Sequence, residues 1–166
     1  MNETSTAPDP QDHFGIAVLI SGFFRALDER RFEEGWADAY FTDDLHVTTP
    51  VGEATGADAI RLAEESVSRF AATLHISSDV LVHPAPDART ADVTWNAHMT
   101  HVHPDTSLFT VGGVYEARFR RTDEGWRVGR MGVRAVWTAG EPPVLGAEAD
   151  ARVQVPAGAE APAGPA

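Results

Sequence analysis

Cysteine and lysine are both absent from this sequence of 166 residues, in which all thirteen basic residues are arginines. Without cysteine the chain has no disulfide, no thiolate metal site and no cysteine nucleophile. Without lysine it has no Schiff-base chemistry and no lysine that could act as a general base. Two residue types that serve many enzymes are therefore excluded from any account of its function.

Long apolar runs and an excess of positive charge are also missing. No stretch approaches the roughly 20 apolar residues that span a bilayer. Residues 1–13 are polar and lack the basic start and apolar block of a secretory signal. The formal net charge of −12 argues against nucleic-acid partners and against anionic membrane surfaces. We therefore expect a cytoplasmic protein, long enough for one domain with a buried core.

Composition divides the chain into three parts. Residues 1–11 predict a disordered leader, residues 12–138 a folded domain, and residues 139–166 a tail rich in alanine, proline and glycine. The tail holds two short apolar stretches, 144–145 and 153–155, which leave open that it docks on the domain or covers the mouth of a pocket.

Hydrophobic periodicity predicts helices early in the domain and long strands later. Helices are expected at 12–30, 32–40 and 57–72. The first has Asp12 as its N-cap and an apolar stripe made of Phe14, Val18, Leu19, Phe23 and Leu27. Strands are expected at 45–49, 74–83, 90–103, 108–121 and 126–138, with a break at 50–56 and a turn at 122–125. This order predicts an α+β fold in which an antiparallel sheet curves around about three helices and leaves a pocket at its mouth.

The strand predicted at 90–103 has two unlike faces. With the two-residue period of a strand, Val93, Trp95, Ala97, Met99 and His101 fall on one side, whereas Asp92, Thr94, Asn96, His98 and Thr100 fall on the other. His101 therefore ends an apolar face, where an imidazole is a candidate acid, base or substrate hydrogen bonder; it could equally lie solvated at the pocket mouth. His98 has the wrong parity to join it.

Asp28 and His75 are two possible partners for His101. A carboxylate that is hydrogen-bonded to one ring nitrogen of a histidine fixes its tautomer, which suits the other nitrogen to act as a general base. The alternative is structural: Asp28 would cap a helix or pair with Arg30 or Arg31, and His75 would be a core residue. The residues alone leave both interpretations open.

Several large side chains could line a pocket for a flat hydrophobic ligand, namely Trp36, Tyr40, Trp95, Met99 and Tyr115, while Phe23 and Trp126 are better explained as core. The spacing His98-x-x-His101-x-His103 suggests a metal site, but His98 points to the opposite side of the strand and no carboxylate follows at a suitable spacing. We therefore expect neither a metal nor another cofactor.

Three segments resemble SnoaL-like domains of the nuclear-transport-factor-2-like superfamily. They are residues 28–50 (DERRFEEGWADAYFTDDLHVTTP), residues 73–78 (TLHISS) and residues 113–128 (GVYEARFRRTDEGWRV). The resemblance covers about residues 12–138 and implies a cone-shaped fold with a central hydrophobic pocket. That fold hosts dehydratases, isomerases, cyclases, epoxide hydrolases and binding proteins without activity.

The resemblance also implies residue roles. In ketosteroid-isomerase-like members a catalytic aspartate precedes Pro-Val-Gly and a tyrosine on the first helix supplies the oxyanion hole; Thr49 and Phe23 stand there in this chain. In scytalone-dehydratase-like and dehydrochlorinase-like members an aspartate on helix one pairs with a histidine, and these positions match Asp28 and His75. A second histidine of the dehydratases matches His101. The dehydratase tyrosine beside the aspartate is Leu27 here, and Tyr115 replaces an amide side chain.

Together these observations favour a cofactor-free acid–base enzyme, a dehydratase, isomerase or cyclase, that acts on a small hydrophobic polyketide-like or aromatic intermediate. Asp28, His75 and His101 are the predicted catalytic residues. The predicted substrate contacts are Trp36, Tyr40, Thr49, Trp95, Met99 and Tyr115. A binding module for a small molecule or peptide is the main alternative, and an epoxide-opening hydrolase or cyclase a weaker one. The resemblance further implies a homodimer that pairs through the outer face of the sheet.

Overall fold

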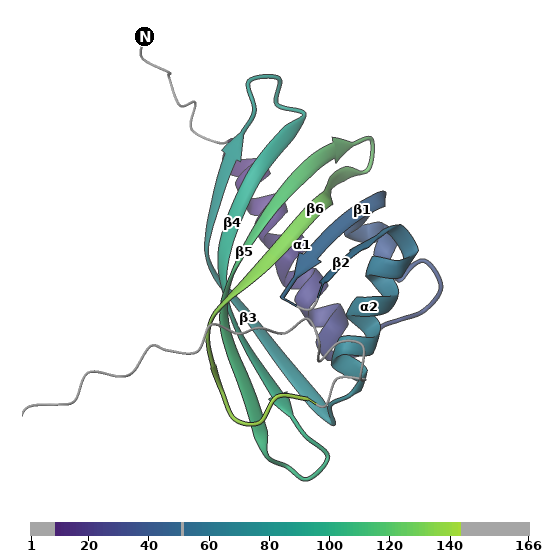
Figure 1. The fold of residues 1–166 in the computed structure, drawn as a ribbon. Helices are drawn as coiled ribbons and strands as arrows, with labels where there is room; N and C mark the ends of the chain where they lie inside the picture. The colour runs from purple at the N-terminus through teal and green to yellow at the C-terminus, as the bar shows by residue number, and fades with distance from the viewer. Residues whose placement is uncertain (1–8, 51, 144–166) are drawn as a thin grey trace, which may run out of the picture.

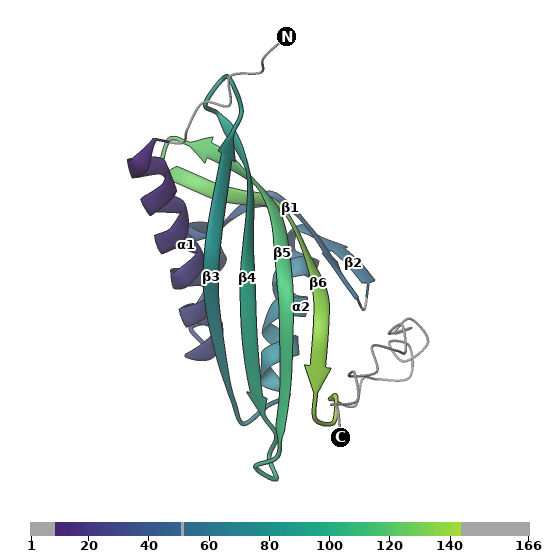
Figure 2. The same ribbon diagram turned by 90° about the vertical axis from the view of Figure 1, so that its left-hand side faces the viewer.

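The computed structural model describes residues 9–50 and 52–143, which form a curved sheet with helices on its concave side (Figure 1). Two α-helices are present in these residues, α1 (Pro10–Asp28) and α2 (Gly56–Ser68), together with a short 3-10 helix, η1 (Trp36–Ala39). Figure 2 views the convex face of the sheet and shows both α-helices behind the strands or at their edge. The predicted α+β class is confirmed. Neither of the described helices is long and apolar enough to cross a bilayer.

Six strands make up the sheet. They are β1 (Phe41–Thr49), β2 (Gly52–Thr55), β3 (Ala72–Pro84), β4 (Thr90–Val102), β5 (Leu108–Thr122) and β6 (Gly125–Ala139). Their order is β2-β1-β6-β5-β4-β3, so the sheet is open, with β2 and β3 at its two edges. The three hairpins from β3 to β6 are antiparallel, as predicted from their short turns.

Two features of the sheet differ from the prediction. β1 pairs with β6 in parallel. The chain leaves β1 through β2 and α2, enters the sheet again at the far edge as β3, and comes back through β4 and β5 until β6 lies beside β1. The predicted break at 50–56 contains β2, whose residues pair antiparallel with β1 from His46↔Thr55 to Thr49↔Gly52. Short turn-like sequences of this kind form strands only where a neighbouring edge offers hydrogen bonds.

The helices also differ from the prediction in number and in their ends. The expected helix at 32–40 is reduced to η1, since Gly35 before it has a left-handed φ of 78° that interrupts helical geometry. Helix α1 starts at Pro10 rather than at residue 12, because the N-cap is Asp9, which accepts a hydrogen bond from the backbone N–H of Gln11 at 2.8 Å. Asp12 instead accepts a hydrogen bond from Trp126 Nε1 at 3.1 Å.

The buried stripe of α1 matches the predicted one at Phe23 and Leu27, which are each 5% exposed, and differs from it at Phe14 and Val18. Phe14 and Val18 are 70% and 53% exposed, whereas Ile16, Ile20 and Phe24 are 2% exposed or less. These three side chains belong to the core, in which the concave side of β4 contributes Val93 and Trp95, as predicted from the strand parity. The predicted leader (1–11) and the predicted tail (139–166) lie largely outside the described residues. The apolar tail stretches 144–145 and 153–155 lie entirely outside them.

Candidate active site

The site begins at the last residue of α1, where Asp28 meets two residues of β3. The carboxylate accepts three hydrogen bonds: from Nδ1–H of His75 at 2.6 Å, from the backbone N–H of His75 at 2.9 Å and from the hydroxyl of Thr73 at 2.8 Å. Thr73 and His75 lie two residues apart, so they share the concave face of the sheet and both reach the helix end. The side chains of His75 and Asp28 are 5% and 13% exposed.

Arg30 holds this arrangement in place from behind. Its guanidinium donates hydrogen bonds to the Thr73 hydroxyl at 2.9 Å, to the carbonyl of Leu27 at 2.8 Å and to the carbonyl of Val67 at 2.8 Å. Since the Thr73 oxygen accepts from Arg30, its own hydrogen is directed to Asp28. Sequence reasoning considered Arg30 only as a possible ion-pair partner of Asp28, but the Asp28 atom that it contacts is the backbone carbonyl. The left-handed φ of 55° at Arg30 gave no signal in the sequence.

The charge state of Asp28 fixes the tautomer of His75. Burial acts to raise the pKa of Asp28, but the hydrogen bonds from His75 and Thr73 outweigh it and leave that pKa below its ordinary value of 3.8. An ionised carboxylate can only accept hydrogen bonds, so in the neutral imidazole of His75 the hydrogen is on Nδ1 and Nε2 carries a lone pair. Within the described residues Nε2 of His75 has no hydrogen-bond partner. It is also not fully buried, because among these residues Trp95 Nε1 is the one fully buried side-chain nitrogen or oxygen that lacks a partner. The lone pair of His75 is therefore reachable.

His101 lies next to His75, with ring centroids 5.6 Å apart and ring planes at 88°. Its Nδ1–H donates to the carbonyl of Phe109 at 3.2 Å, and its ring packs 4.6 Å from the ring of Phe70. Burial, together with the neighbouring His75, lowers the pKa of His101 to about 4. At neutral pH this imidazole is therefore uncharged and presents Nε2 as a hydrogen-bond acceptor.

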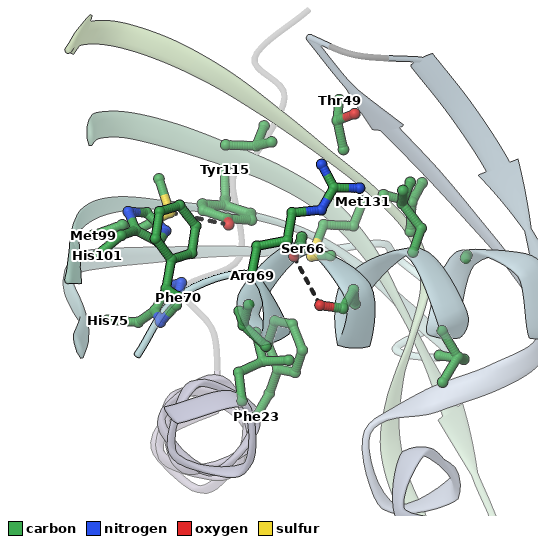
Figure 3. A pocket seen from close by; sticks show the side chains of 18 of the residues that line it. Phe23, Thr49, Ser66, Arg69, Phe70, His75, Met99, His101, Tyr115 and Met131 are labelled. Carbon is green, nitrogen blue, oxygen red and sulfur yellow. Dashed lines mark hydrogen bonds between the residues drawn. The ribbon is translucent and has the colours of Figure 1, made fainter. Parts of the chain in front are cut away.

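A cavity of about 270 Å³ lies beside the two histidines, between α2 and the concave face of the sheet (Figure 3). Five of the predicted site residues line it: Thr49, His75, Met99, His101 and Tyr115. The remaining lining is mostly aliphatic and aromatic and includes Phe23, Phe70 and Phe109. The hydroxyl of Tyr115 donates to the sulfur of Met99 at 3.5 Å, and burial raises the pKa of Tyr115 above its ordinary value, so the phenol stays protonated.

Three predicted substrate contacts do not line this cavity. Trp95 is buried behind it, stacked on Tyr115 with ring centroids 4.8 Å apart. Trp36 donates from Nε1 to Glu64 at 2.7 Å, and it lines a separate surface hollow. Tyr40 packs on Phe23, with ring centroids 6.2 Å apart. The parity of β4 placed Trp95 on the correct face of the sheet, but parity gives no information on whether that part of the face is filled by neighbours.

Sequence reasoning missed two lining residues at the end of α2. Phe70 falls within the helix predicted at 57–72, but α2 ends at Ser68 and Phe70 turns its ring onto His101. Arg69, the C-cap residue, lines the cavity with its long side chain. Only the position of the helix end reveals these roles, and helix ends are the least predictable feature of a sequence.

The model of the SnoaL-like domain matches residues 11–132, which is most of the chain, and the protein belongs to this family. Among the curated proteins no sequence matches.

Solved structures show the same fold. A protein from Kribbella flavida is 20% identical, with a TM-score of 0.70, and covers 78% of this chain and 93% of its own. A candidate scytalone dehydratase from Novosphingobium aromaticivorans is 23% identical, with a TM-score of 0.67 and coverage of 76% and 85%. A hexachlorocyclohexane dehydrochlorinase from Novosphingobium barchaimii is 18% identical, with a TM-score of 0.67 and coverage of 82% and 92%. At these identities the likeness establishes the fold, which is that of nuclear-transport-factor-2-like proteins.

Proposed function

We propose that this protein is an acid–base enzyme, a lyase or isomerase of the dehydratase or cyclase type, that acts without a cofactor on a small hydrophobic molecule. The observation that carries the proposal is the Asp28–His75 pair, in which Nε2 of His75 has no partner among the described residues and borders an apolar cavity. A general base needs this combination of a fixed tautomer, a free lone pair and room for a substrate.

His75 would take a proton from a carbon next to a carbonyl group or next to a carbon with a leaving group. The electrons of the broken C–H bond form a double bond or an enolate, and Asp28 stabilises the imidazolium that results. The same imidazolium can then give its proton to a departing hydroxyl, which completes a dehydration, or to another carbon, which completes an isomerisation. Since the lining is apolar, the charges that develop interact more strongly than they would in water.

His101 and Tyr115 would bind polar groups of the substrate. A histidine with a pKa near 4 is a poor proton donor at neutral pH, so His101 serves to accept a hydrogen bond from a substrate hydroxyl rather than as a general acid. The Tyr115 hydroxyl donates to a thioether, which is a weak acceptor, so a carbonyl oxygen of the substrate can compete for it.

The structural relatives support the reaction class. One is described as a candidate scytalone dehydratase and another as a hexachlorocyclohexane dehydrochlorinase, and both names denote an elimination. The cavity volume of about 270 Å³ lies just below the usual range of roughly 300–1,000 Å³ for ligand pockets and fits a molecule of one or two fused rings. A polyketide-like or aromatic intermediate is of this kind.

The test is the turnover of a bicyclic β-hydroxy ketone, whose dehydration gives a naphthol detected by its ultraviolet absorbance. We expect His75→Ala to lower kcat about 10²–10⁴-fold with an unchanged circular dichroism spectrum. His98→Ala is the matched control, because His98 lies on the opposite face of β4 and is expected to leave turnover unchanged. Full activity of His75→Ala would refute the proposal. If the wild type binds such ketones but neither dehydrates them nor exchanges their α-protons with D₂O, the binding module replaces the enzyme.

We also propose a homodimer formed through the convex face of the sheet. Ile76, Val136 and Trp137 are about half exposed there, and large apolar side chains gathered on one face typically mark an interface. Gly112 admits the indole of Trp137, since a Cβ at that glycine would come within 2.2 Å of Trp137 Nε1. Sedimentation equilibrium should give a dimer mass for the wild type and a monomer mass for Trp137→Glu. A monomeric wild type would refute the dimer.

A further inference from the structure

Arg69 brings a positive charge into the wall of an otherwise apolar cavity. It follows the last residue of α2, and its side chain lines the cavity. In Figure 3 the side chain extends along the cavity, away from the end at which Phe70, His75 and His101 gather. Among the described residues that line the cavity there is no aspartate or glutamate, so nothing in this wall offsets the charge.

Arg61 on the same helix shows what a structural arginine looks like in this protein. Its guanidinium pairs with Glu65 at 2.9 Å and with Asp58 at 3.1 Å, outside the cavity. The backbone N–H of Arg69 donates to the carbonyl of Val67, but its guanidinium forms no hydrogen bond or ion pair within residues 9–50 and 52–143, although the chain carries 25 acidic residues against 13 basic ones. An arginine that stays unpaired in so acidic a chain, next to a cavity, is available to a ligand.

The opposite end of the cavity has the complementary chemistry. His75 and His101 both hold their hydrogen on Nδ1, toward Asp28 and toward the Phe109 carbonyl. Both Nε2 atoms are therefore hydrogen-bond acceptors, and neither has a partner among the described residues. A ligand that matches the whole cavity has hydrogen-bond donors at one end, an apolar middle, and a negatively charged hydrogen-bond acceptor at the other end.

We propose that the ligand is an amphipathic monoanion, a fused-ring molecule whose carboxylate pairs with Arg69 and whose hydroxyl, at the far end, donates to His101. This assignment deepens the proposed function, on which its description as a substrate rests. A carboxylate fits better than a phosphate, because one guanidinium fork matches the two oxygens of a carboxylate and its single charge. Arg69 thereby sets substrate specificity and contacts no reacting atom.

The test compares three probes by isothermal titration calorimetry with the full chain: 6-hydroxy-2-naphthoate, its neutral amide and 2-naphthoate, which lacks the hydroxyl. We expect the wild type to bind the hydroxynaphthoate roughly tenfold more tightly than the amide, as charge-assisted pairing with an exposed arginine beside an apolar cavity allows. Arg69→Gln should remove this preference and Arg69→Lys should retain part of it. Arg61→Gln, the matched control, should retain all of it. 2-Naphthoate, which lacks the hydroxyl, should bind the wild type more weakly than 6-hydroxy-2-naphthoate does, by a factor smaller than that between carboxylate and amide.

Three results would overturn the proposal: equal affinity of the wild type for carboxylate and amide, loss of the preference in Arg61→Gln as well, or no binding of any probe. None of them depends on turnover. If the preference is absent while His75→Ala still abolishes dehydration of the neutral ketone, the acid–base function stands and the anionic ligand is wrong. If the wild type prefers the carboxylate over the amide but shows no turnover, Arg69 selects the ligand of a binding protein without catalytic activity.

Discussion

The two ends of the concave face are built from the same strand pattern and differ in what covers them. At one end Val93 and Phe119 pack with Ile16 and Ile20 of α1, and all four are 1% exposed or less. At the other end Met99 and His101 continue the alternation of β4, but they border a cavity. Helix α1 ends at Asp28, level with His75 and with its strand neighbour Met99. The point at which the helix ends therefore decides where the core becomes a site.

Unpaired polar atoms show the same difference. In the packed region the indole N–H of Trp95 is fully buried and has no partner in the part of the chain that the structure describes, an arrangement that typically costs about 1–3 kcal/mol. In the open region the unpartnered Nε2 atoms of His75 and His101 border the cavity and can be hydrated or bound to a ligand. A similar defect in hydrogen bonding is a cost to the fold at one end and a potential binding group at the other.

Asp28→Asn should give the largest effect on turnover, because it removes the general base from the open end of the concave face. An amide can donate to Nδ1 of His75, which moves the hydrogen to Nε2 and removes the lone pair. We expect kcat to fall about 10²–10⁴-fold, with a much smaller change in KM. Steady-state kinetics with the bicyclic ketone checks this. The matched control is Asp44→Asn, whose carboxylate pairs with Arg120 on the protein surface. A decrease confined to KM would show that Asp28 only helps to bind.

A pair of phenylalanines tests whether packing really differs between the two ends. Phe119 is fully buried at the packed end, whereas Phe109 lines the cavity and is partly exposed. We expect Phe119→Ala to lower the free energy of unfolding by about 3–5 kcal/mol, the usual cost of a large cavity in a packed core. Phe109→Ala should cost less than half as much, since fewer neighbours lose contact. Urea unfolding at pH 7 measures both, and equal losses would contradict the comparison.

The sequence predicted which face of an element each residue lies on better than it predicted how neighbouring elements fill the space against that face. The two-residue period of β4 placed Trp95, Met99 and His101 on one face, and all three lie on the concave side. The period could not separate the filled part of that face, at Trp95, from the open part, at Met99 and His101, because this depends on where α1 ends. In α1 itself apolar residues lie nearly all around the helix, so periodicity alone could not choose Ile16 and Ile20 over Phe14 and Val18.

The site was predictable only where short segments resemble a known family. Asp28 and His75 are 47 positions apart, and no local pattern joins them; the resemblance suggested the pair that the structure brings together. Arg30 and Arg69 carry no such signal. Arg30 acts through a left-handed φ and through hydrogen bonds to α1, α2 and β3, and Arg69 through the point at which α2 ends.

Arg30→Gln should produce an intermediate effect, since Arg30 positions Thr73 without touching the substrate. Loss of its bonds to Thr73 and Val67 should lower the free energy of unfolding by about 1–3 kcal/mol. We expect kcat to fall about tenfold, since Asp28 keeps both bonds to His75 but loses the alignment of Thr73. Arg31→Gln is the control, because Arg31 pairs with Glu29 on the surface. A fall in stability with kcat unchanged would make Arg30 purely structural.

The smallest effect is expected from His101, in the dependence of stability on pH. Burial lowers the pKa of His101 from 6.5 to about 4, so between these values the unfolded chain binds a proton there that the folded chain does not. Stability should therefore fall as the pH is lowered from 6.5 toward 4. Asp28, whose pKa is also lowered, loses its contribution only at lower pH, as the pH falls below 3.8. His101→Asn should flatten the curve of urea midpoint against pH between 6.5 and 4. If the variant keeps the full slope, other groups cause it, and the imidazole of His101 is not held neutral by the cavity.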